Sequence, residues 1–370
     1  MKPHAPVASA AELPPGPQER RTAKRGTAMS SVTDKAATPA AQRTARQADW
    51  LRSILGNQQF LLLVALAALV GYFTARNSVF VSTGEIAGML LVFSELILLA
   101  VGETFVIVSG GIDLSVGAVA GFSGVVAAFA MRDLLAGHQS EALVLTVGTA
   151  ICASIGIGVG LVNSALIHWA RLVPFVATLI TLGAGTGMAI VLTGGAPIGS
   201  DSAAIGLTAD RVGPFPYLSL SVIAIAAIAW LYLHRSRYGR YTFAIGSSAF
   251  AARAAGINVR RHLTSVYVLS GLLAGLTGMV FYMQLGSGAP TSGDGAELTA
   301  IAAVVIGGAS LLGGVGQMGG TILGALILTV VSAGLIISNV SPNYNKVAVA
   351  ICIAAAASLQ ALRPSGRRER

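Results

Sequence analysis

Apolar residues form long runs over most of the chain, and short polar segments separate these runs. A helix that crosses a bilayer needs about 20 apolar residues. When the runs are divided at charged and turn-forming residues, ten of them reach or approach that length. They occupy residues 59–75, 84–109, 114–131, 142–167, 173–193, 217–234, 264–285, 297–312, 318–338 and 346–362. We therefore expect an all-α polytopic membrane protein with about ten transmembrane helices.

The polar segments between the runs carry their charges asymmetrically. With the N-terminus inside, the cytoplasmic segments contain 20 of the 24 Lys and Arg residues, six of them in the connection 235–262. The acidic residues of the connections fall on the opposite side, at Asp133, Glu141, Asp201, Asp210, Asp294 and Glu297. Cytoplasmic loops carry an excess of Lys and Arg, so the pattern predicts that both termini lie in the cytoplasm.

A glycine pair interrupts two of the runs in similar surroundings, VIVSGGIDLSVG at 106–117 and VVIGGASLLGGVG at 304–316. The pairs are Gly110–Gly111 and Gly307–Gly308, and each predicts a broken helix. Glycine-broken segments at matching places in two halves are typical of a transport site. A chance recurrence in a chain with 45 glycines is the alternative.

Asp113 follows the first glycine pair, where the helix is expected to restart. Its carboxylate can cap the new helix by accepting the N–H of Ser115 or Val116, and the helix dipole favours a negative charge there. We expect Gly110–Gly111, Asp113 and Ser115 to hold the broken helix in shape. Direct contact between Asp113 and a transported substrate is the alternative.

Two carboxylates and one amide lie within the runs themselves. A carboxylate at the centre of a spanning helix costs about 3 kcal/mol even on the mildest scale, so such residues indicate function by default. Glu95 and Glu103 are eight residues apart and share one helix face. We expect Glu95 and Asn163 to line a translocation pathway. A structural hydrogen bond to a neighbouring helix is the alternative for each, and Glu103 has the further alternative of lying near the cytoplasmic surface.

The composition agrees with a membrane protein and separates the tails from the rest. Only 11% of the residues are charged and the mean hydropathy is +0.74, whereas a soluble domain carries about 25% charged residues. Residues 1–51 have almost no large apolar side chains, so we expect a disordered cytoplasmic tail, with a second candidate initiator at Met29. The transmembrane permease domain is expected at 52–362 and a basic cytoplasmic tail at 363–370.

The sequence contains no catalytic or metal-binding pattern. It has no GxxxxGK[ST] motif, so the chain is not expected to bind ATP in that way. The five histidines lie in tails and loops without metal-ligand spacing, and the two cysteines lie inside apolar runs. The basic residues form no face interleaved with aromatics, so nucleic acid is not an expected partner. We expect a protein that is not an enzyme and that binds no cofactor or metal itself.

The longest internal polar segment, residues 234–262, has a centre of high helix propensity. Ser247 or Ser248 can begin a short helix over AFAARAA, and Gly256 can end it in the left-handed conformation. Six arginines and no acidic residue make the segment strongly cationic. These residues fit a loop held to anionic lipid head groups and fit equally a docking helix for a cytoplasmic protein.

Three stretches, in order, resemble one family: residues 102–121 (GETFVIVSGGIDLSVGAVAG), 238–278 (YGRYTFAIGSSAFAARAAGINVRRHLTSVYVLSGLLAGLTG) and 300–328 (AIAAVVIGGASLLGGVGQMGGTILGALIL). They are similar to the integral-membrane permeases of carbohydrate ABC importers of the ribose and xylose type, related to the branched-chain amino acid permeases. The resemblance covers residues 59–362. It implies a second permease copy, identical or paralogous, cytoplasmic subunits that bind ATP and Mg²⁺, and a periplasmic or lipid-tethered sugar-binding protein.

The resemblance also favours the docking interpretation of the cationic segment. The residues that it assigns to coupling with the ATPase are Ala251, Ala252, Arg253, Gly256 and Ile257. We expect Ser248, which can begin the helix, and Phe250 to belong to the same docking surface. Relatives usually have an acidic residue shortly before the Ala-Ala pair, where this chain has Ala249 and Phe250. An apolar contact in place of a charged one would make the subunit selective for its own ATPase.

The implied function is ATP-driven import of a small sugar, a pentose or hexose, across a bacterial inner membrane. One alternative is a related ABC permease for nucleosides or branched-chain amino acids. An alternative of a different class is an ion-coupled secondary transporter, in which Glu95 and Glu103 would be the proton sites.

Overall fold

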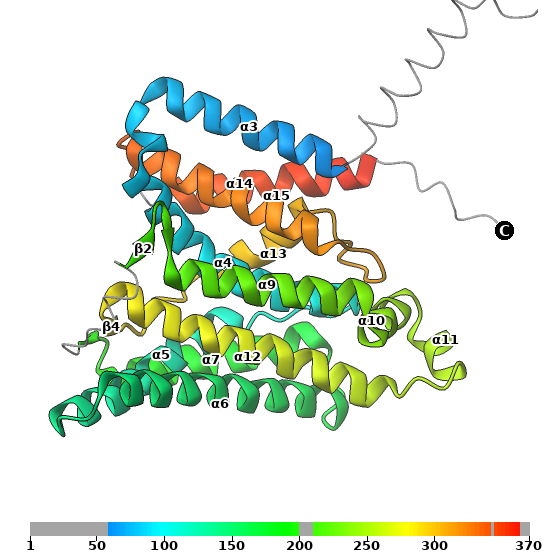
Figure 1. Ribbon diagram of the computed structural model, residues 1–370. Helices are drawn as coiled ribbons and strands as arrows, with labels where there is room; N and C mark the ends of the chain where they lie inside the picture. Colours follow the sequence, from blue (N-terminus) through cyan, green and yellow to red (C-terminus); the bar gives the residue numbers. More distant parts are fainter. Residues whose placement is uncertain (1–57, 200–209, 342–343, 363–370) are drawn as a thin grey trace, which may run out of the picture. The chain divides into compact units, whose positions relative to one another are not determined.

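The computed structural model describes residues 58–199, 210–341 and 344–362, which all belong to one compact unit, Leu55–Arg370 (Figure 1). The expected tails 1–51 and 363–370 lie outside the described residues. The elements in chain order are α3 (Gln58–Arg76), η1 (Ser78–Val81), α4 (Thr83–Val108), α5 (Val116–Ala136), α6 (Glu141–His168), α7 (Pro174–Thr193), β1 (Ile198–Gly199), β2 (Arg211–Val212), β3 (Phe215–Pro216), α9 (Tyr217–Arg235), α10 (Arg237–Ser247), α11 (Ala249–Ala254), α12 (Val259–Leu285), β4 (Ser287–Gly288), α13 (Ala296–Ile306), α14 (Met318–Ile337) and α15 (Tyr344–Leu362).

Eight of the described helices are long and apolar enough to cross a membrane, namely α3, α4, α5, α6, α7, α9, α12 and α14. They coincide with eight of the ten expected runs, and the prediction of an all-α polytopic membrane protein is confirmed. The tenth run forms α15, which has 19 residues. The eighth run forms α13, whose 11 residues rise about 16 Å, roughly half the hydrocarbon thickness. The exact number of spans stays a prediction.

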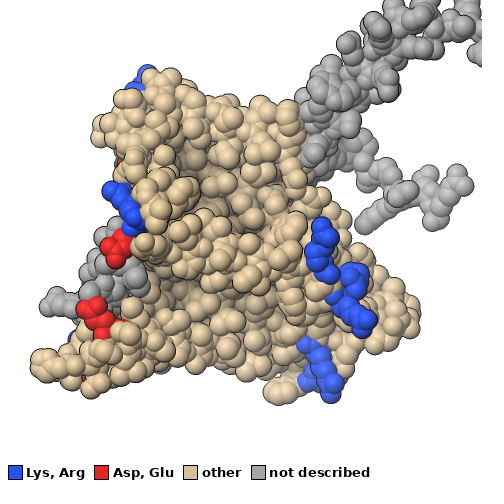
Figure 2. Space-filling model, in the orientation of Figure 1, with Lys and Arg blue, Asp and Glu red and all other residues tan. Residues whose placement is uncertain are grey.

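Connections that were predicted to lie on the same side of the membrane contact one another in the structure. At one end, β1 after α7 pairs antiparallel with β4 after α12. At the other end, the N–H of Gly314 donates to the carbonyl of Val108 over 2.9 Å. Figure 2 shows Lys and Arg gathered where α10 and α11 lie, whereas Asp and Glu lie at the opposite end among other basic residues. The alternation of the helices agrees with the expected order, and which end faces the cytoplasm stays a prediction.

Helix α12 is central to the described unit and packs against α4, α5 and α6 (Figure 1). Glycines allow it to approach α6 closely: a Cβ added at Gly156 would overlap the carbonyl oxygen of Gly271, and the reverse also holds. Lipid tails are as apolar as leucine, so close packing of small residues is a main source of association between membrane helices. The pair α6–α12 therefore depends on the absence of side chains at this crossing.

Both predicted helix breaks are present. Helix α4 ends at Val108 and α5 begins at Val116, with Gly110 between them at a φ of 87°. Helix α13 ends at Ile306, and Gly308 has a φ of 94°. Glycine adopts this left-handed conformation without steric cost, whereas other residues do not. The second break ends its helix earlier than the run 297–312 indicated. Hydrophobicity alone does not show where the backbone leaves the helical conformation.

We expect Gly156→Leu to prevent the close approach of α6 and α12, because the added side chain would meet the backbone of α12. Overpacking of this kind costs about 1–3 kcal/mol or more, so the yield of monodisperse protein should fall. Size-exclusion chromatography of a fluorescent fusion would measure it. Gly158→Leu on the same helix is the control, since nothing lies within 4 Å of a Cβ at that position. Equal yields for both variants would contradict the account.

Candidate functional site

The carboxylate of Asp113 closes the break between α4 and α5. Its Oδ1 accepts the N–H of Ser115 at 3.0 Å and the hydroxyl of the same residue at 2.5 Å. Ser115 itself is at the N-cap of α5 and makes no capping bond with its side chain. The carboxylate therefore holds the residues just before the helix, as the sequence indicated for the N–H of Ser115.

Polar side chains from two other helices complete the surroundings of this carboxylate. Ser270 of α12 donates to Oδ2 of Asp113 at 2.9 Å. Asn163 of α6 donates to the hydroxyl oxygen of Ser115 at 2.9 Å and more weakly to Asp113 at 3.5 Å. Thr181 of α7 donates to Oδ1 of Asn163 at 2.6 Å. This buried polar cluster thus links the break to α6, α7 and α12.

Glu103 joins the buried polar cluster from the last turns of α4. Its Oε1 accepts the N–H of Asp113 at 3.2 Å, and both side chains are fully buried. Its Oε2 and the hydroxyl of Tyr267 are buried and have no hydrogen-bond partner within the described residues. A Cβ at Gly111 would overlap that hydroxyl, so Tyr267 of α12 lies directly against the break.

The sequence placed Asp113 and Ser115 at the helix break and Asn163 on a pathway, whereas the structure brings all three together. Asn163 is buried in the cluster, so in this conformation its contacts are those of a structural residue, and its place on a pathway stays a prediction. The sequence analysis missed Ser270 and Thr181. A serine or threonine inside an apolar run gives no sign of its partner, because that partner lies on another helix.

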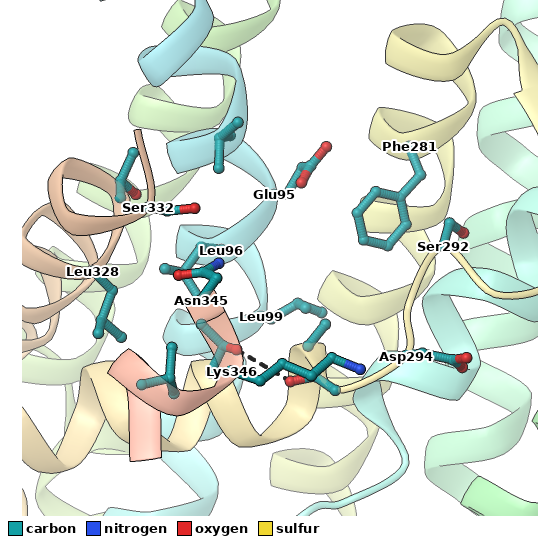
Figure 3. A pocket seen from close by; sticks show the side chains of 16 residues that line it. Glu95, Leu96, Leu99, Phe281, Ser292, Asp294, Leu328, Ser332, Asn345 and Lys346 are labelled. Carbon is teal, nitrogen blue, oxygen red and sulfur yellow. Dashed lines mark hydrogen bonds between the residues drawn. The ribbon is translucent and has the colours of Figure 1, made fainter. Parts of the chain in front are cut away.

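Glu95 lies in different surroundings, although it shares a helix with Glu103. It lines a pocket of about 210 Å³ together with Phe281 of α12 and residues near the starts of α13 and α15 (Figure 3). The polar lining residues are Glu95, Ser292, Asp294, Thr299, Thr329, Ser332, Asn345 and Lys346. The Oδ1 of Asn345 is buried and accepts no hydrogen bond within the described part of the chain. The pocket thus offers a carboxylate, an unused amide oxygen, hydroxyls and an aromatic ring.

The cationic segment 234–262, which we call the coupling segment from here on, contains the short helix that the sequence predicted. Ser248 begins α11 by accepting the N–H of Ala251 at 3.2 Å, and Gly256 follows its end with a φ of 83°. Ala252 is buried among apolar neighbours, whereas the side chain of Phe250 is 80% exposed. Aromatic residues and arginine are enriched at protein–protein interfaces, and both are exposed on this helix.

A second helix, α10, precedes α11 and joins it to the membrane domain. The sequence analysis left these residues, Arg237–Ser247, as a polar connection. The hydroxyl oxygen of Thr242 on α10 and Nε2 of His262 on α12 are hydrogen-bonded at 2.9 Å. Tyr238 accepts a hydrogen bond from Ser265 at 3.0 Å, and burial raises the pKa of Tyr238 to about 12, so its hydroxyl stays protonated. Helix α10 is therefore fixed to α12 along its length.

The end of α10 touches the α4–α5 break and the connection between α13 and α14, at a contact that we call the glycine junction. A Cβ at Gly246 would overlap the carbonyl of Val108 and would lie 2.5 Å from the N–H nitrogen of Gly314. A Cβ at Gly313 would lie 2.8 Å from the Cα of Gly110. Three backbones, from the α4–α5 break, the end of α10 and the α13–α14 connection, thus meet without intervening side chains.

The α13–α14 connection also presents apolar side chains beside this junction. Leu312 and Val315 are 83% and 60% exposed. Gly314 packs against Ser247, the last residue of α10, so the connection adjoins the coupling segment. The glycine junction therefore brings together two segments that carry exposed apolar side chains. One is the coupling segment, with Phe250, and the other is the α13–α14 connection, with Leu312 and Val315.

Known proteins are similar to most of this chain. The family described as branched-chain amino acid transport system / permease component matches residues 85–357. The ribose import permease protein RbsC of Escherichia coli is 36% identical over 79% of this chain and 90% of its own length. The D-allose transport system permease protein AlsC of the same organism is 33% identical, over 82% and 90%. The galactose/methyl galactoside import permease protein MglC of Haemophilus influenzae is 30% identical, over 83% and 95%.

The matched region contains α4 to α14 and therefore both helix breaks, the coupling segment and the Glu95 pocket. A probable ABC transporter permease protein of Sinorhizobium fredii, y4mJ, is 39% identical over 69% of this chain and 74% of its own length. No solved structure matches the chain. These relatives favour an ABC permease over the ion-coupled secondary transporter. The chain belongs to the family of the branched-chain amino acid transport system permease component, the multi-pass membrane permeases of ABC importers.

Proposed function

We propose that this permease conducts a small sugar, a pentose or hexose, through the inner membrane. The Glu95 pocket is the observation that carries the proposal, because it combines a carboxylate, the free amide oxygen of Asn345 and the ring of Phe281. Sugar hydroxyls donate to such oxygens, and an apolar sugar face can lie on an aromatic ring. The relatives named for ribose, allose and galactose support the same substrate class.

An amino acid is the second candidate, and Lys346 in the same pocket is the observation that favours it. Its ammonium could pair with a substrate carboxylate while Glu95 received the amino group. Uptake of radiolabelled ribose, galactose and leucine by proteoliposomes containing the complete importer would separate the two. Sugar uptake without leucine uptake is the expected result, and the reverse would overturn the sugar assignment.

The arginine-rich end is proposed to face the cytoplasm, with both termini on that side. Cytoplasmic subunits that bind ATP and Mg²⁺ would dock on α11 and on the exposed side chains of Leu312 and Val315. The binding protein would deliver substrate at the opposite end, near the Glu95 pocket. A second permease, identical or paralogous, would complete the pathway. The alternation of the helices and the separation of charges support this orientation (Figure 2).

The glycine junction is proposed to carry movement from the ATPase into the membrane. A displacement of α11 moves α10, because only Ser248 separates the two helices. The end of α10 is in backbone contact with the α4–α5 break and with the connection that follows the second break, and no flexible side chain absorbs the displacement. Packed interfaces change between discrete arrangements rather than deforming continuously, so the breaks would shift together with α11.

Asp113 is proposed to be a structural residue of this device rather than a substrate contact. Its oxygens accept hydrogen bonds from Ser115, Asn163 and Ser270, which leaves no free acceptor facing a cavity. A buried carboxylate is stable only when such donors replace water.

The substitution Glu95→Gln should lower sugar uptake several-fold, because the amide offers one acceptor oxygen where the carboxyl group has two, and one hydrogen bond contributes about 0.5–1.5 kcal/mol. Glu95→Leu should lower it further, since no acceptor remains. The initial rate of uptake by the complete importer measures both. Glu85→Gln, on the first turn of the same helix and outside the pocket, should leave uptake unchanged. Normal uptake by the Leu variant would remove Glu95 from the pathway.

Asp113→Asn should be mild, because the amide oxygen can still accept from Ser115 and the hydroxyl of Ser270 can turn to accept. Asp113→Leu leaves buried donors unpaired at about 1–3 kcal/mol each, so it should lower the melting temperature of the purified permease. If the Asn variant folds normally and transports nothing, the charge is needed and the structural role is wrong.

Gly256→Val should weaken coupling while insertion stays normal. A β-branched residue at a φ of 83° is strained by about 1–2 kcal/mol, which displaces the end of α11. Arg253→Glu reverses a charge on the proposed docking surface and should act in the same direction, whereas Arg253→Lys should be milder. Co-purification of the ATPase and substrate-stimulated ATP hydrolysis are the measurements.

The matched control is Gly213→Val, at a φ of 60° in the turn between β2 and β3, with nothing within 4 Å of its Cβ. This turn lies at the opposite end of α9 from the coupling segment, so ATPase binding should not change. Retention of a functional ATPase by the Gly256→Val and Arg253→Glu variants would contradict the docking proposal.

A further inference from the structure

A cleft of about 800 Å³ lies between the end of α6 and the start of α12. It is separate from the Glu95 pocket and contains no residue of α11. The lining residues that matter here are Leu161, Val162, His168, Trp169, Arg260 and Arg261. They combine apolar, aromatic and cationic groups at the arginine-rich end of the molecule.

The two arginines give the cleft a positive charge that the chain does not neutralise. Arg260 and Arg261 lie in the first turn of α12, which contains no acidic residue. Among the described residues the only ion pair joins Arg132 and Asp133, so neither arginine of the cleft has a carboxylate partner there. Cations at a helix N-terminus are also opposed by the helix dipole. An anion in the cleft would relieve both conditions.

The other wall of the cleft is lined by residues that are suited to contact with lipid. The guanidinium of Arg260 lies over the ring of Trp169 at 5.5 Å, and tryptophan is typical of the membrane–water interface. Leu161 and Val162 are 50% and 49% exposed on α6, a membrane-spanning helix. The Nε2 of His168 is buried in the same region without a partner among the described residues.

We propose that this cleft binds an anionic phospholipid, with its phosphate between Arg260 and Arg261 and an acyl chain along Leu161 and Val162. Leu161 precedes His168 by seven residues, so it lies about 10 Å deeper along the helix. A free phosphate would leave that apolar wall uncovered, and an acidic segment of a cytoplasmic protein would not extend to it. Only the choice of the cytoplasmic leaflet rests on the proposed orientation.

The position of the lipid would connect it to coupling. Four residues, 255–258, separate α11 from α12, so the lipid would hold α6 against the helix on which the docking segment is mounted. The close glycine crossing of these two helices lies deeper along the same pair. The lipid would therefore restrain the cytoplasmic ends, where the glycines do not.

Native mass spectrometry of the full-length permease, titrated with phosphatidylglycerol or phosphatidylcholine, tests the proposal without ATP, sugar or partner subunits. Phosphatidylglycerol should bind more tightly. The double variant Arg260→Gln/Arg261→Gln should bind it about thirtyfold more weakly, because each basic residue near an anionic head group adds to the affinity. The control Arg237→Gln/Arg240→Gln removes two arginines of α10 outside the cleft and should bind normally.

Equal affinity of the two double variants would overturn the site. Inorganic phosphate that competes as well as phosphatidylglycerol would identify a simple anion site, and expulsion of the lipid by the ATPase would identify a protein interface; either result overturns the proposal. These outcomes are independent of transport, so failure here leaves the proposed function standing.

A second readout needs no substitution in the cleft. In the variant Trp50→Phe/Trp230→Phe, Trp169 is the only tryptophan. Brominated phosphatidylglycerol should quench its fluorescence at lower mole fraction than brominated phosphatidylcholine. Equal quenching by the two lipids would contradict selective binding of an anionic head group.

Discussion

The hydrogen bonds of one buried carboxylate, that of Asp113, join three segments of this permease: the α4–α5 break, α6 and α12. A carboxylate without partners in a low-dielectric interior is strongly unfavourable, so its donors have to stay in place. These donors come from Ser115 in the break, Asn163 in α6 and Ser270 in α12. Displacement of any one of the three segments would leave charge or donors unpaired. The cluster therefore favours a concerted rearrangement over a local one.

The glycine junction adds a mechanical constraint at the same break. Gly110 lies three residues before Asp113 and touches the α13–α14 connection, while Val108 contacts both Gly246 and Gly314. One face of the break is thus fixed by hydrogen bonds inside the membrane domain, and the other is fixed by backbone contacts to the coupling segment. A movement that enters through α10 reaches the buried polar cluster over a few residues, without a long chain of side-chain contacts.

The sequence predicted the features that depend on local pattern and missed those that depend on pairing. Apolar runs, the helix breaks at the two glycine pairs, the left-handed Gly256 and the helix after Ser248 are set by neighbouring residues, and all are present. The hydrogen bond of Ser270 to Asp113 joins residues 157 positions apart, and no local property of an apolar run reveals it. Helix α10 was missed for a related reason. Its glycines and aromatic residues have modest helix propensity, and its contacts with α12 determine its structure.

The two carboxylates of α4 lie in different surroundings in this conformation. Glu95 and Glu103 share a helix face, yet the first lines a pocket near Asp294 and Lys346, and the second is sealed in the polar cluster. Every residue of α4 from Leu96 to Val108 is buried. A substrate at Glu95 is thus separated from the arginine-rich end by two turns of packed helix and by the cluster itself. Under the proposed function, a substrate in the Glu95 pocket would face this closed region, and the hydrogen bonds of Asp113 are the contacts that a passage through the subunit would have to rearrange.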